Sequence, residues 1–159
     1  MSATDPKTIK LEVYDHNGYR EGVAGEDNIT PGMLLDIDAN GDVIKHADEG
    51  ENVVPYIAVE NDYIGDDIDD DYMDEDQVRY HIGITGERYY AWLDAGENVS
   101  EGDLLESAGD GTLQGYTLPE DTDGGTSGEI HVNAARFVAR EDLDASGETD
   151  PQRIIVEVA

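Results

Sequence analysis

The stretch that decides the fold is ITPGMLLDIDANGDVIKH, residues 29–46, in which two apolar runs flank a turn. A calcium-binding EF-hand loop begins with the same pattern, since Asp36, Asp38 and Asn40 stand at alternate positions and Gly41 follows. An EF-hand loop also needs flanking helices and a bidentate acid at its twelfth position, where this chain has Ala47. Asn-Gly between apolar runs is instead typical of a β-hairpin, so the sequence predicts a hairpin here.

A second copy of this stretch follows in the chain. The two copies are AGEDNITPGMLLDIDANGDV at 24–43 and AGENVSEGDLLESAGDGTL at 95–113. They share the triplet Ala-Gly-Glu and the pair Leu-Leu. Both copies have the same pair of turn glycines, which are Gly32 and Gly41 in the first copy and Gly102 and Gly111 in the second. The second copy keeps the turn and loses the alternating acids, which favours a turn over a calcium loop. The sequence therefore predicts a duplicated strand unit, about 23–82 and 94–158.

The rest of the chain also has the pattern of short strands. TIKLEVYD, residues 8–15, alternates apolar and polar side chains, and RYYAWLDA and RIIVEVA are further β-rich runs. No segment has a sustained helical period. We therefore predict an all-β fold, a small β-barrel or sandwich built from two similar strand units with short acidic loops and little helix. We expect both halves to build one barrel, because neither half alone has enough apolar surface.

Two segments have no counterpart in the other half. Residues 1–22 precede the repeat and are predicted to form an N-terminal arm, which leaves 23–159 as a single β domain. PEDTDGGTSG, residues 119–128, is rich in Gly and acids and is predicted to be a flexible, exposed loop.

The charge of the chain limits its partners. It has 39 Asp and Glu against 9 Lys and Arg, a formal charge of −30. Such a charge opposes the compact state in dilute buffer, whereas salt above 1 M reduces the screening length to about 3 Å. The composition therefore indicates a halophilic protein. With so few cations, binding to nucleic acid or to an anionic membrane surface is not expected.

Motifs for catalysis are not recognised in the sequence, so the chain is not expected to be an enzyme or to need a cofactor. Its four histidines have no metal-ligand spacing, and no serine stands in a nucleophile-elbow context. No metal site is predicted, although the dense acidic run DDIDDDYMDEDQ offers Asp67, Asp69 and Asp71 to a hard cation. The competing interpretation is a solvated acidic loop.

The aromatic residues of RYYAWLD, which are Tyr89, Tyr90 and Trp92, lie on both faces of a predicted strand. Aromatics on both faces are consistent with one core face and one face that contacts another subunit, and plain core packing is the alternative.

Several of these runs resemble one family. AGENVSEGDLLESAGDGTLQ (95–114) resembles the signature run of the head decoration, or capsid cement, proteins of tailed viruses. ITPGMLLDIDANGDVIKHADEG (29–50), VPYIAVEN (54–61) and GDDIDDDYMDEDQVRYHI (65–82) resemble the run that precedes it. The resemblance implies a β-rich structural protein on the outer surface of an icosahedral capsid, often a homotrimer. Its partners would be the major capsid protein and other copies of itself, and the acidity fits a virus of halophilic archaea.

We hypothesise that the N-terminal arm anchors the protein to the coat. Ile9, Leu11 and Val13 alternate with Lys10, Glu12 and Tyr14, which suits a strand that adds to the sheet edge of a neighbour. The residues expected to contact the capsid are Ile9, Leu11, Val13 and Tyr14. On this hypothesis, deletion of residues 1–20 abolishes binding to the shell and leaves the barrel folded. The protein would be made in the host cytoplasm and located in the virion.

Other functions stay open on the sequence alone. One is an intracellular halophilic β-barrel that binds a small ligand or a protein partner, which would have a concave apolar pocket. Another is a hydrolase with a pair of carboxylates, one of them with a raised pKa. A tail or spike protein would be a variant of the virion function.

Overall fold

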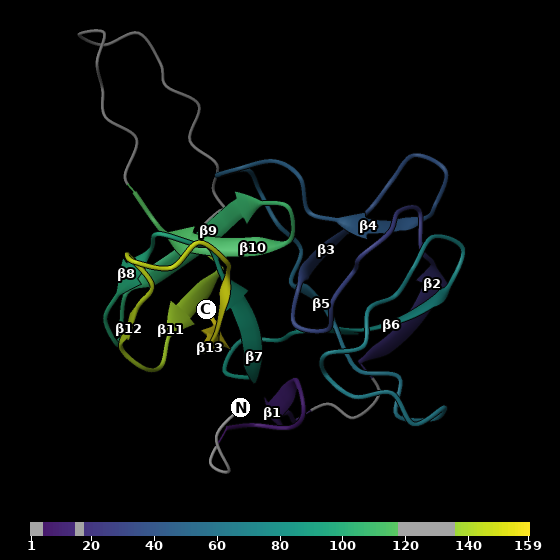
Figure 1. Ribbon diagram of the computed structural model, residues 1–159, viewed down its shortest axis with the longest axis horizontal. Helices are drawn as coiled ribbons and strands as arrows, with labels where there is room; N and C mark the ends of the chain where they lie inside the picture. Colours follow the sequence, from purple (N-terminus) through teal and green to yellow (C-terminus); the bar gives the residue numbers. More distant parts are fainter. Residues whose placement is uncertain (1–4, 15–17, 118–135) are drawn as a thin grey trace, which may run out of the picture.

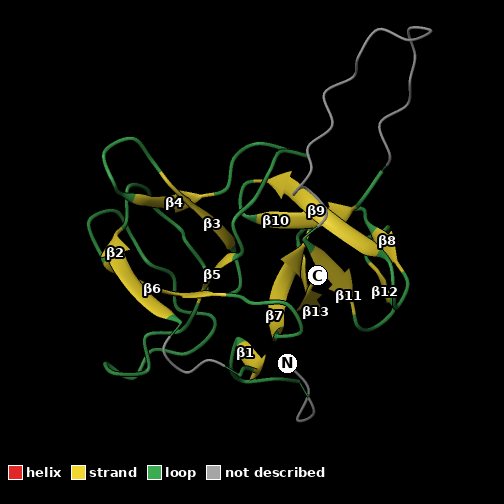
Figure 2. Ribbon diagram, turned by 180° about the vertical axis from the view of Figure 1, so that it is seen from behind, coloured by secondary structure: helices red, strands yellow, loops and turns green. Residues whose placement is uncertain are grey.

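The computed structural model describes residues 5–14, 18–117 and 136–159. Figure 1 and Figure 2 show an arrangement of strands and loops without helices in these ranges, so the all-β prediction is confirmed. In this described part there is accordingly no helix that could cross a membrane. The strands are β1 (Lys10–Glu12), β2 (Tyr19–Val23), β3 (Leu34–Ile37), β4 (Val43–Lys45), β5 (Tyr56–Ala58), β6 (Gln77–Ile82), β7 (Arg88–Leu93), β8 (Asn98–Val99), β9 (Leu104–Gly109), β10 (Thr112–Gly115), β11 (Phe137–Ala139), β12 (Leu143–Asp144) and β13 (Gln152–Val158).

Strands of the second half close into a small barrel. Its order is β7, β10, β9, β11 and β13, and β13 returns to pair with β7 in antiparallel fashion. β7 also meets β10 in parallel, at Leu93 and Leu113, which completes the ring. β8 and β12 form a separate two-stranded pair.

Strands of the first half have the same order as those of the second. They form a five-stranded sheet, β2-β6-β5-β3-β4, and a parallel bridge from Ala24 to Val43 brings its two edges together. The hairpin β3–β4 corresponds to β9–β10, β3–β5 to β9–β11, β5–β6 to β11–β13, and β2–β6 to β7–β13. The prediction of two similar strand units is therefore confirmed. The expectation that both halves share one barrel is wrong, because β7 to β13 close without a strand from β2 to β6.

The quoted stretch forms the predicted hairpin, β3–β4. The carboxylate of Asp38 accepts the backbone N–H groups of Asn40, at 2.8 Å, and Asp42, at 2.9 Å. These bonds, that of Asp42 most of all, lower the pKa of Asp38 below its usual value. Side chains that would ligate calcium in an EF-hand thus hold the turn instead.

The shared Ala-Gly-Glu has one structural role in both copies. The carboxylate of Glu26 accepts the N–H of Lys45 at 2.5 Å, and that of Glu97 accepts the N–H of Gly115 at 2.9 Å. Lys45 ends β4 and Gly115 ends β10, so each glutamate fixes the last residue of the same hairpin strand. The repeated acids are therefore structural.

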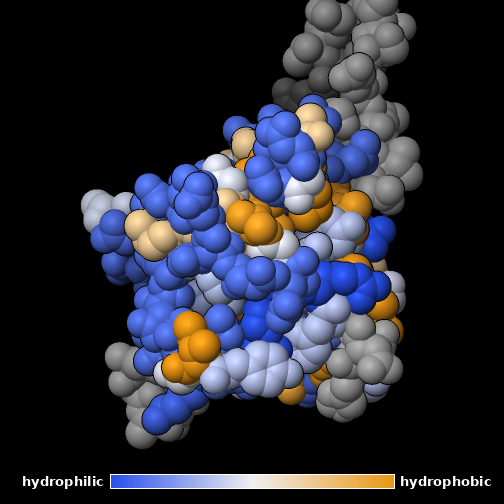
Figure 3. Space-filling model, turned by 90° about the vertical axis from the view of Figure 1, so that its right-hand side faces the viewer, coloured by the Kyte–Doolittle hydropathy of each residue, from blue (hydrophilic) through white to orange (hydrophobic). Residues whose placement is uncertain are grey.

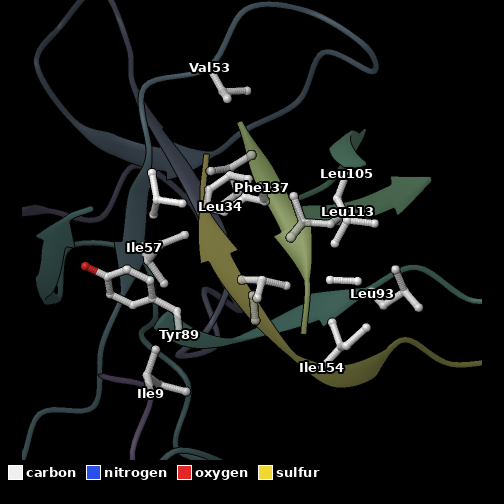
Figure 4. Close-up of a cluster of buried hydrophobic side chains, with 14 of the residues drawn as sticks. Ile9, Leu34, Val53, Ile57, Tyr89, Leu93, Leu105, Leu113, Phe137 and Ile154 are labelled. Atoms are coloured by element: carbon white, nitrogen blue, oxygen red, sulfur yellow. The ribbon is translucent and has the colours of Figure 1, made fainter. Parts of the chain in front are cut away.

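The apolar side chains form two clusters. The Leu-Leu pair of β3 points to opposite sides, as successive strand residues do, so Leu35 joins the smaller cluster within the first unit. Leu34 joins the larger cluster, which also contains Ile57 of the first unit and Phe137 of the barrel. Figure 4 shows these side chains gathered between the strands of the two units. One core therefore spans the junction between the units.

The N-terminal residues are part of this fold where the structure describes them. β1 pairs with β7, and Ile9 is fully buried in the larger cluster, close to Tyr89 in Figure 4. β2, which begins at Tyr19, pairs with β6. In residues 5–14 and 18–22, the predicted arm is therefore not separate from the β structure, because Ile9 is part of the core and β1 and β2 pair with β7 and β6. The predicted loop 119–128 lies outside the described residues.

Candidate functional site

The edge of the barrel sheet is formed by β1, which in the described residues pairs only with β7. The N–H of Tyr90 donates to the carbonyl of Ile9 at 2.8 Å. In an antiparallel pair this geometry directs the backbone N–H and C=O of the next residue, Lys10, away from β7. The outer edge of β1 thus has main-chain groups that a strand of another protein could bond.

The residues predicted to contact the capsid differ in their exposure. Ile9 is fully buried, Leu11 and Val13 are half-buried, and Tyr14 is 71% exposed. The backbone N–H of Tyr14 donates to the buried carboxylate of Glu87 at 2.9 Å, which holds this end of the segment on the barrel. Tyr14 can therefore meet a partner, whereas the predicted contact through Ile9 is wrong in this conformation because the core already contains it.

A buried polar network joins the two units. Nδ1 of His81, on β6, lies 2.5 Å from the hydroxyl of Tyr89, on β7, and this hydroxyl donates to Glu87 at 2.8 Å. All three side chains are fully buried. Burial, with the bond to Glu87, raises the pKa of the Tyr89 hydroxyl. The subunit contact predicted for Tyr89 is therefore wrong, because the side chain is enclosed in its own chain.

Tyr90 and Trp92 are half-buried on the opposite face of β7. Nε1 of Trp92 donates to the carbonyl of Pro31 at 2.9 Å. The guanidinium of Arg153 lies 4.2 Å from the centre of the Trp92 ring and donates to Asp69 at 2.6 Å. The face predicted to contact another subunit thus attaches the barrel to turns of the first unit.

The acids named as weak metal candidates are not brought together. Asp67 accepts the N–H of Asp69 at 2.8 Å, Asp69 pairs with Arg153, and Asp71 accepts the hydroxyl of Thr30 at 2.6 Å. Across 5–14, 18–117 and 136–159, no group of three or more acids and histidines is placed to hold a metal ion. Asp67 thus stabilises its own turn, whereas Asp69 and Asp71 bond residues distant in the chain.

The four turn glycines have left-handed backbone angles, with φ of +97° at Gly32, +91° at Gly41, +97° at Gly102 and +76° at Gly111. Gly32 also lies against β7, because a Cβ at this position would come 2.7 Å from the carbonyl oxygen of Tyr90. A Cβ at Gly111 would likewise come 3.0 Å from Met33, so the glycines shape turns, and Gly32 and Gly111 also lie at close contacts between the units.

A charged cluster ties three strands of the barrel region together. Glu157 accepts bonds from Arg140, at 2.9 and 3.0 Å, and from Arg88, at 2.9 Å. These bonds, those of Arg140 first, lower the pKa of Glu157 to about 2. Arg88 also pairs with Glu12 of β1 at 3.5 Å, so the cluster reaches the edge strand.

The first unit has a hollow of about 380 Å³ that sequence reasoning missed. Its lining residues are Tyr19, Arg20, Glu21, Tyr63 and Arg79. They come from β2, from the turn after β5 and from β6, and no motif connects these segments. The rarity of cations in the chain is the one feature that could have drawn attention to Arg20 and Arg79. Figure 3 views the molecule from the side of β2, β4 and β6 and shows a mostly hydrophilic surface with separate hydrophobic spots.

Comparison with known proteins does not indicate a family. No protein-family model matches the chain, and no curated protein matches it. The function is therefore argued from the residues and their geometry.

Proposed function

We propose that the chain is a structural virion protein that binds the outer surface of an icosahedral capsid and stabilises it, as a homotrimer in high salt. The observation that carries the proposal is the outer edge of β1, beside the exposed Tyr14. Main-chain pairing along such an edge needs no particular side chain, which suits contact with many equivalent coat subunits. The partners are the major capsid protein and further copies of the chain, and no cofactor is required.

The core of the barrel supports binding through the outer surface. Leu93, Leu105, Leu113 and Phe137 are all at most 1% exposed and fill its interior. A filled barrel gives a rigid body, and a rigid body that binds only the assembled shell stabilises the shell by mass action. The acidic surface suits a particle that works in multimolar salt, where screening removes most of the self-repulsion.

The proposal is tested by comparing Lys10→Pro with Lys10→Ala. Both lose the ammonium group, which lies 3.8 Å from the centre of the Tyr19 ring, but only proline also loses the outward backbone N–H. Binding is measured by co-sedimentation, in multimolar KCl, with capsid shells of a tailed virus of halophilic archaea from which outer-surface proteins have been removed. An unmade main-chain bond costs about 1–3 kcal/mol, so Lys10→Pro should bind about tenfold weaker or worse.

Equal binding by the two variants would contradict pairing through the edge of β1. Failure of the unaltered protein to bind any such shell would contradict the proposed function itself. Light scattering of the unaltered protein should give the mass of a trimer in multimolar salt and a smaller mass after dialysis to low salt. A monomer in both solutions would contradict the homotrimer.

A further inference from the structure

The hollow on the first unit has a polar lining whose central cation is already paired. Arg20, Glu21 and Arg79 line it together with two tyrosines. Nη1 of Arg79 donates to Asp62 at 2.5 Å, and its Nε lies 3.9 Å from the carboxylate of Glu21. The side chain of Arg79 is only 8% exposed, so the guanidinium is held in place between these two acids.

The charges at and beside the hollow balance one another. Three cationic side chains and three acids meet here, and these are Lys10, Arg20 and Arg79 with Glu21, Glu60 and Asp62. The guanidinium of Arg79 already faces both tyrosine rings of the lining, 4.2 Å from the centre of Tyr63 and 5.0 Å from that of Tyr19. A cationic ligand would have to displace Arg79 from these rings, and an anionic ligand would have to displace its carboxylates. The hollow therefore favours a ligand without net charge.

Tyr63 offers a flat apolar surface at the hollow. The residue is 80% exposed, and Arg79 covers one face of its ring, so the other face is open to solvent. The turn that carries Tyr63 is ordered by backbone bonds from Ile64 to Asn61, at 3.2 Å, and from Gly65 to Asp62, at 3.3 Å. A ring that is already ordered can hold a ligand with little further loss of conformational freedom.

A neutral saccharide has the chemistry that fits this combination. The C–H groups on one face of a sugar ring pack on the face of an aromatic ring, which carries partial negative charge. Sugar hydroxyl groups both donate and accept, so they can bond to the carboxylate of Glu21, which is 52% exposed, and to the guanidinium of Arg20. The volume of about 380 Å³ is within the range of small-molecule sites, roughly 300–1,000 Å³.

High salt favours the same class of ligand. Salt above 1 M screens attraction between charges beyond about 3 Å, which weakens the recognition of an ion at a distance. Stacking on a ring and hydrogen bonds to hydroxyl groups act at contact and do not depend on the net charge of the ligand. Recognition of an uncharged molecule is therefore the kind that a chain with a charge of −30 can retain in such a solution.

We propose that this hollow binds a neutral saccharide, with Tyr63 stacked on a sugar ring and with Glu21 and Arg20 bonded to its hydroxyl groups. Arg79 positions the site, because it contacts the ring of Tyr63 and lies beside the carboxylate of Glu21. The inference goes beyond the proposed function and does not depend on it, since neither the shell nor a second copy of the chain contributes to the hollow.

The test uses the full chain in multimolar KCl and measures binding by calorimetric titration and saturation-transfer NMR. The probes are neutral trisaccharides of glucose, mannose, galactose and N-acetylglucosamine, and the comparison probes are trisaccharides of the matching uronic acids of the first three. The variants are Tyr63→Ala, which removes the exposed ring, and Tyr63→Phe, which keeps it. Leu104→Ala is the control, because it alters an apolar side chain that is 45% exposed on the barrel. Thermal unfolding confirms that each variant is folded.

At least one neutral trisaccharide should bind the unaltered protein, Leu104→Ala and Tyr63→Phe with equal affinity, and should bind Tyr63→Ala at least tenfold more weakly. Its uronic acid counterpart, where tested, should bind more weakly to the unaltered protein. Absence of binding by all four neutral probes, or equal binding by Tyr63→Ala, would overturn the inference. A loss in Tyr63→Phe as large as that in Tyr63→Ala would contradict stacking, and tighter binding of a uronic acid would contradict a neutral ligand.

The shell experiment reports on the proposed function separately. A chain that binds a saccharide and no shell would keep this inference and lose the virion role. A chain that binds the shell and none of the neutral probes would keep the virion role and lose this inference.

Discussion

The Leu-Leu pair of the repeat allows a sharp comparison between its two copies. Leu34 and Leu104 are the first leucines of the pair in each copy and begin the equivalent strands β3 and β9. Leu34 is 1% exposed and lies in the core shared by the two units, whereas Leu104 is 45% exposed. The same substitution, leucine to alanine, should therefore have very different effects at the two positions.

The size of the difference follows from burial. Replacing a buried leucine by alanine costs about 2–5 kcal/mol of unfolding free energy, through lost transfer energy and the cavity left behind. A substitution at a half-exposed site usually costs less than about 1 kcal/mol. For a chain of this size, about 1 kcal/mol shifts the unfolding midpoint by roughly 2–4 °C. Leu34→Ala should therefore lower Tm by roughly 5–15 °C, and Leu104→Ala by less than about 4 °C.

The assay is thermal unfolding followed by circular dichroism in multimolar KCl, with urea unfolding as a second measurement. Near-equal decreases in Tm for the two variants would refute the shared core, because the sequence repeat by itself gives the two leucines equal weight. A decrease in Tm of less than about 4 °C for Leu34→Ala would also refute the shared core, since the buried leucine at the junction would then contribute little to holding the units together.

Two further predictions concern pH and the turns. Because Arg140 and Arg88 lower the pKa of Glu157 from 4.5 to about 2, the ionised carboxylate stabilises the fold above pH 4.5, and this contribution is lost as the pH falls towards 2. In thermal unfolding, Glu157→Gln should therefore be less stable than the unaltered protein at pH 6 and should approach it near pH 2; a gap that does not change with pH would contradict the pairing. Gly102→Ala should cost about 1–2 kcal/mol for a left-handed alanine, whereas Gly32→Ala should cost more, because its Cβ would also meet a carbonyl oxygen of β7 at 2.7 Å. Equal losses of Tm in the two glycine variants would show that β7 moves aside without cost.

Local structure could be predicted from the sequence alone. The hairpin at Asp38–Asp42 follows from turn residues between apolar runs, and its equivalent at Asp110 and Gly111 uses two left-handed residues, with φ of +50° and +76°. The duplication can also be recognised in the sequence. Glu26 and Glu97 stand at equivalent positions, and each accepts a backbone N–H from the hairpin that follows it. The turn bonds join neighbouring residues, and the two glutamate bonds join residues 19 and 18 positions apart within one strand unit.

Tertiary structure alone decided how the strands assemble and what they expose. The barrel closes by pairing β7 with β13, where Arg88 lies opposite Glu157. Nothing in the sequence of either strand identifies the other as its partner. Ile9 belongs to an alternating run that was expected to bind a neighbouring protein, but it is buried in the core of its own chain. The pattern cannot distinguish the two, because an apolar side chain gains the same free energy of burial against any core that it can reach. The hollow at Arg79 likewise combines segments that carry no common motif. Apolar burial is non-directional, so the sequence determined which residues must leave water, and only the folded chain determined which of them meet.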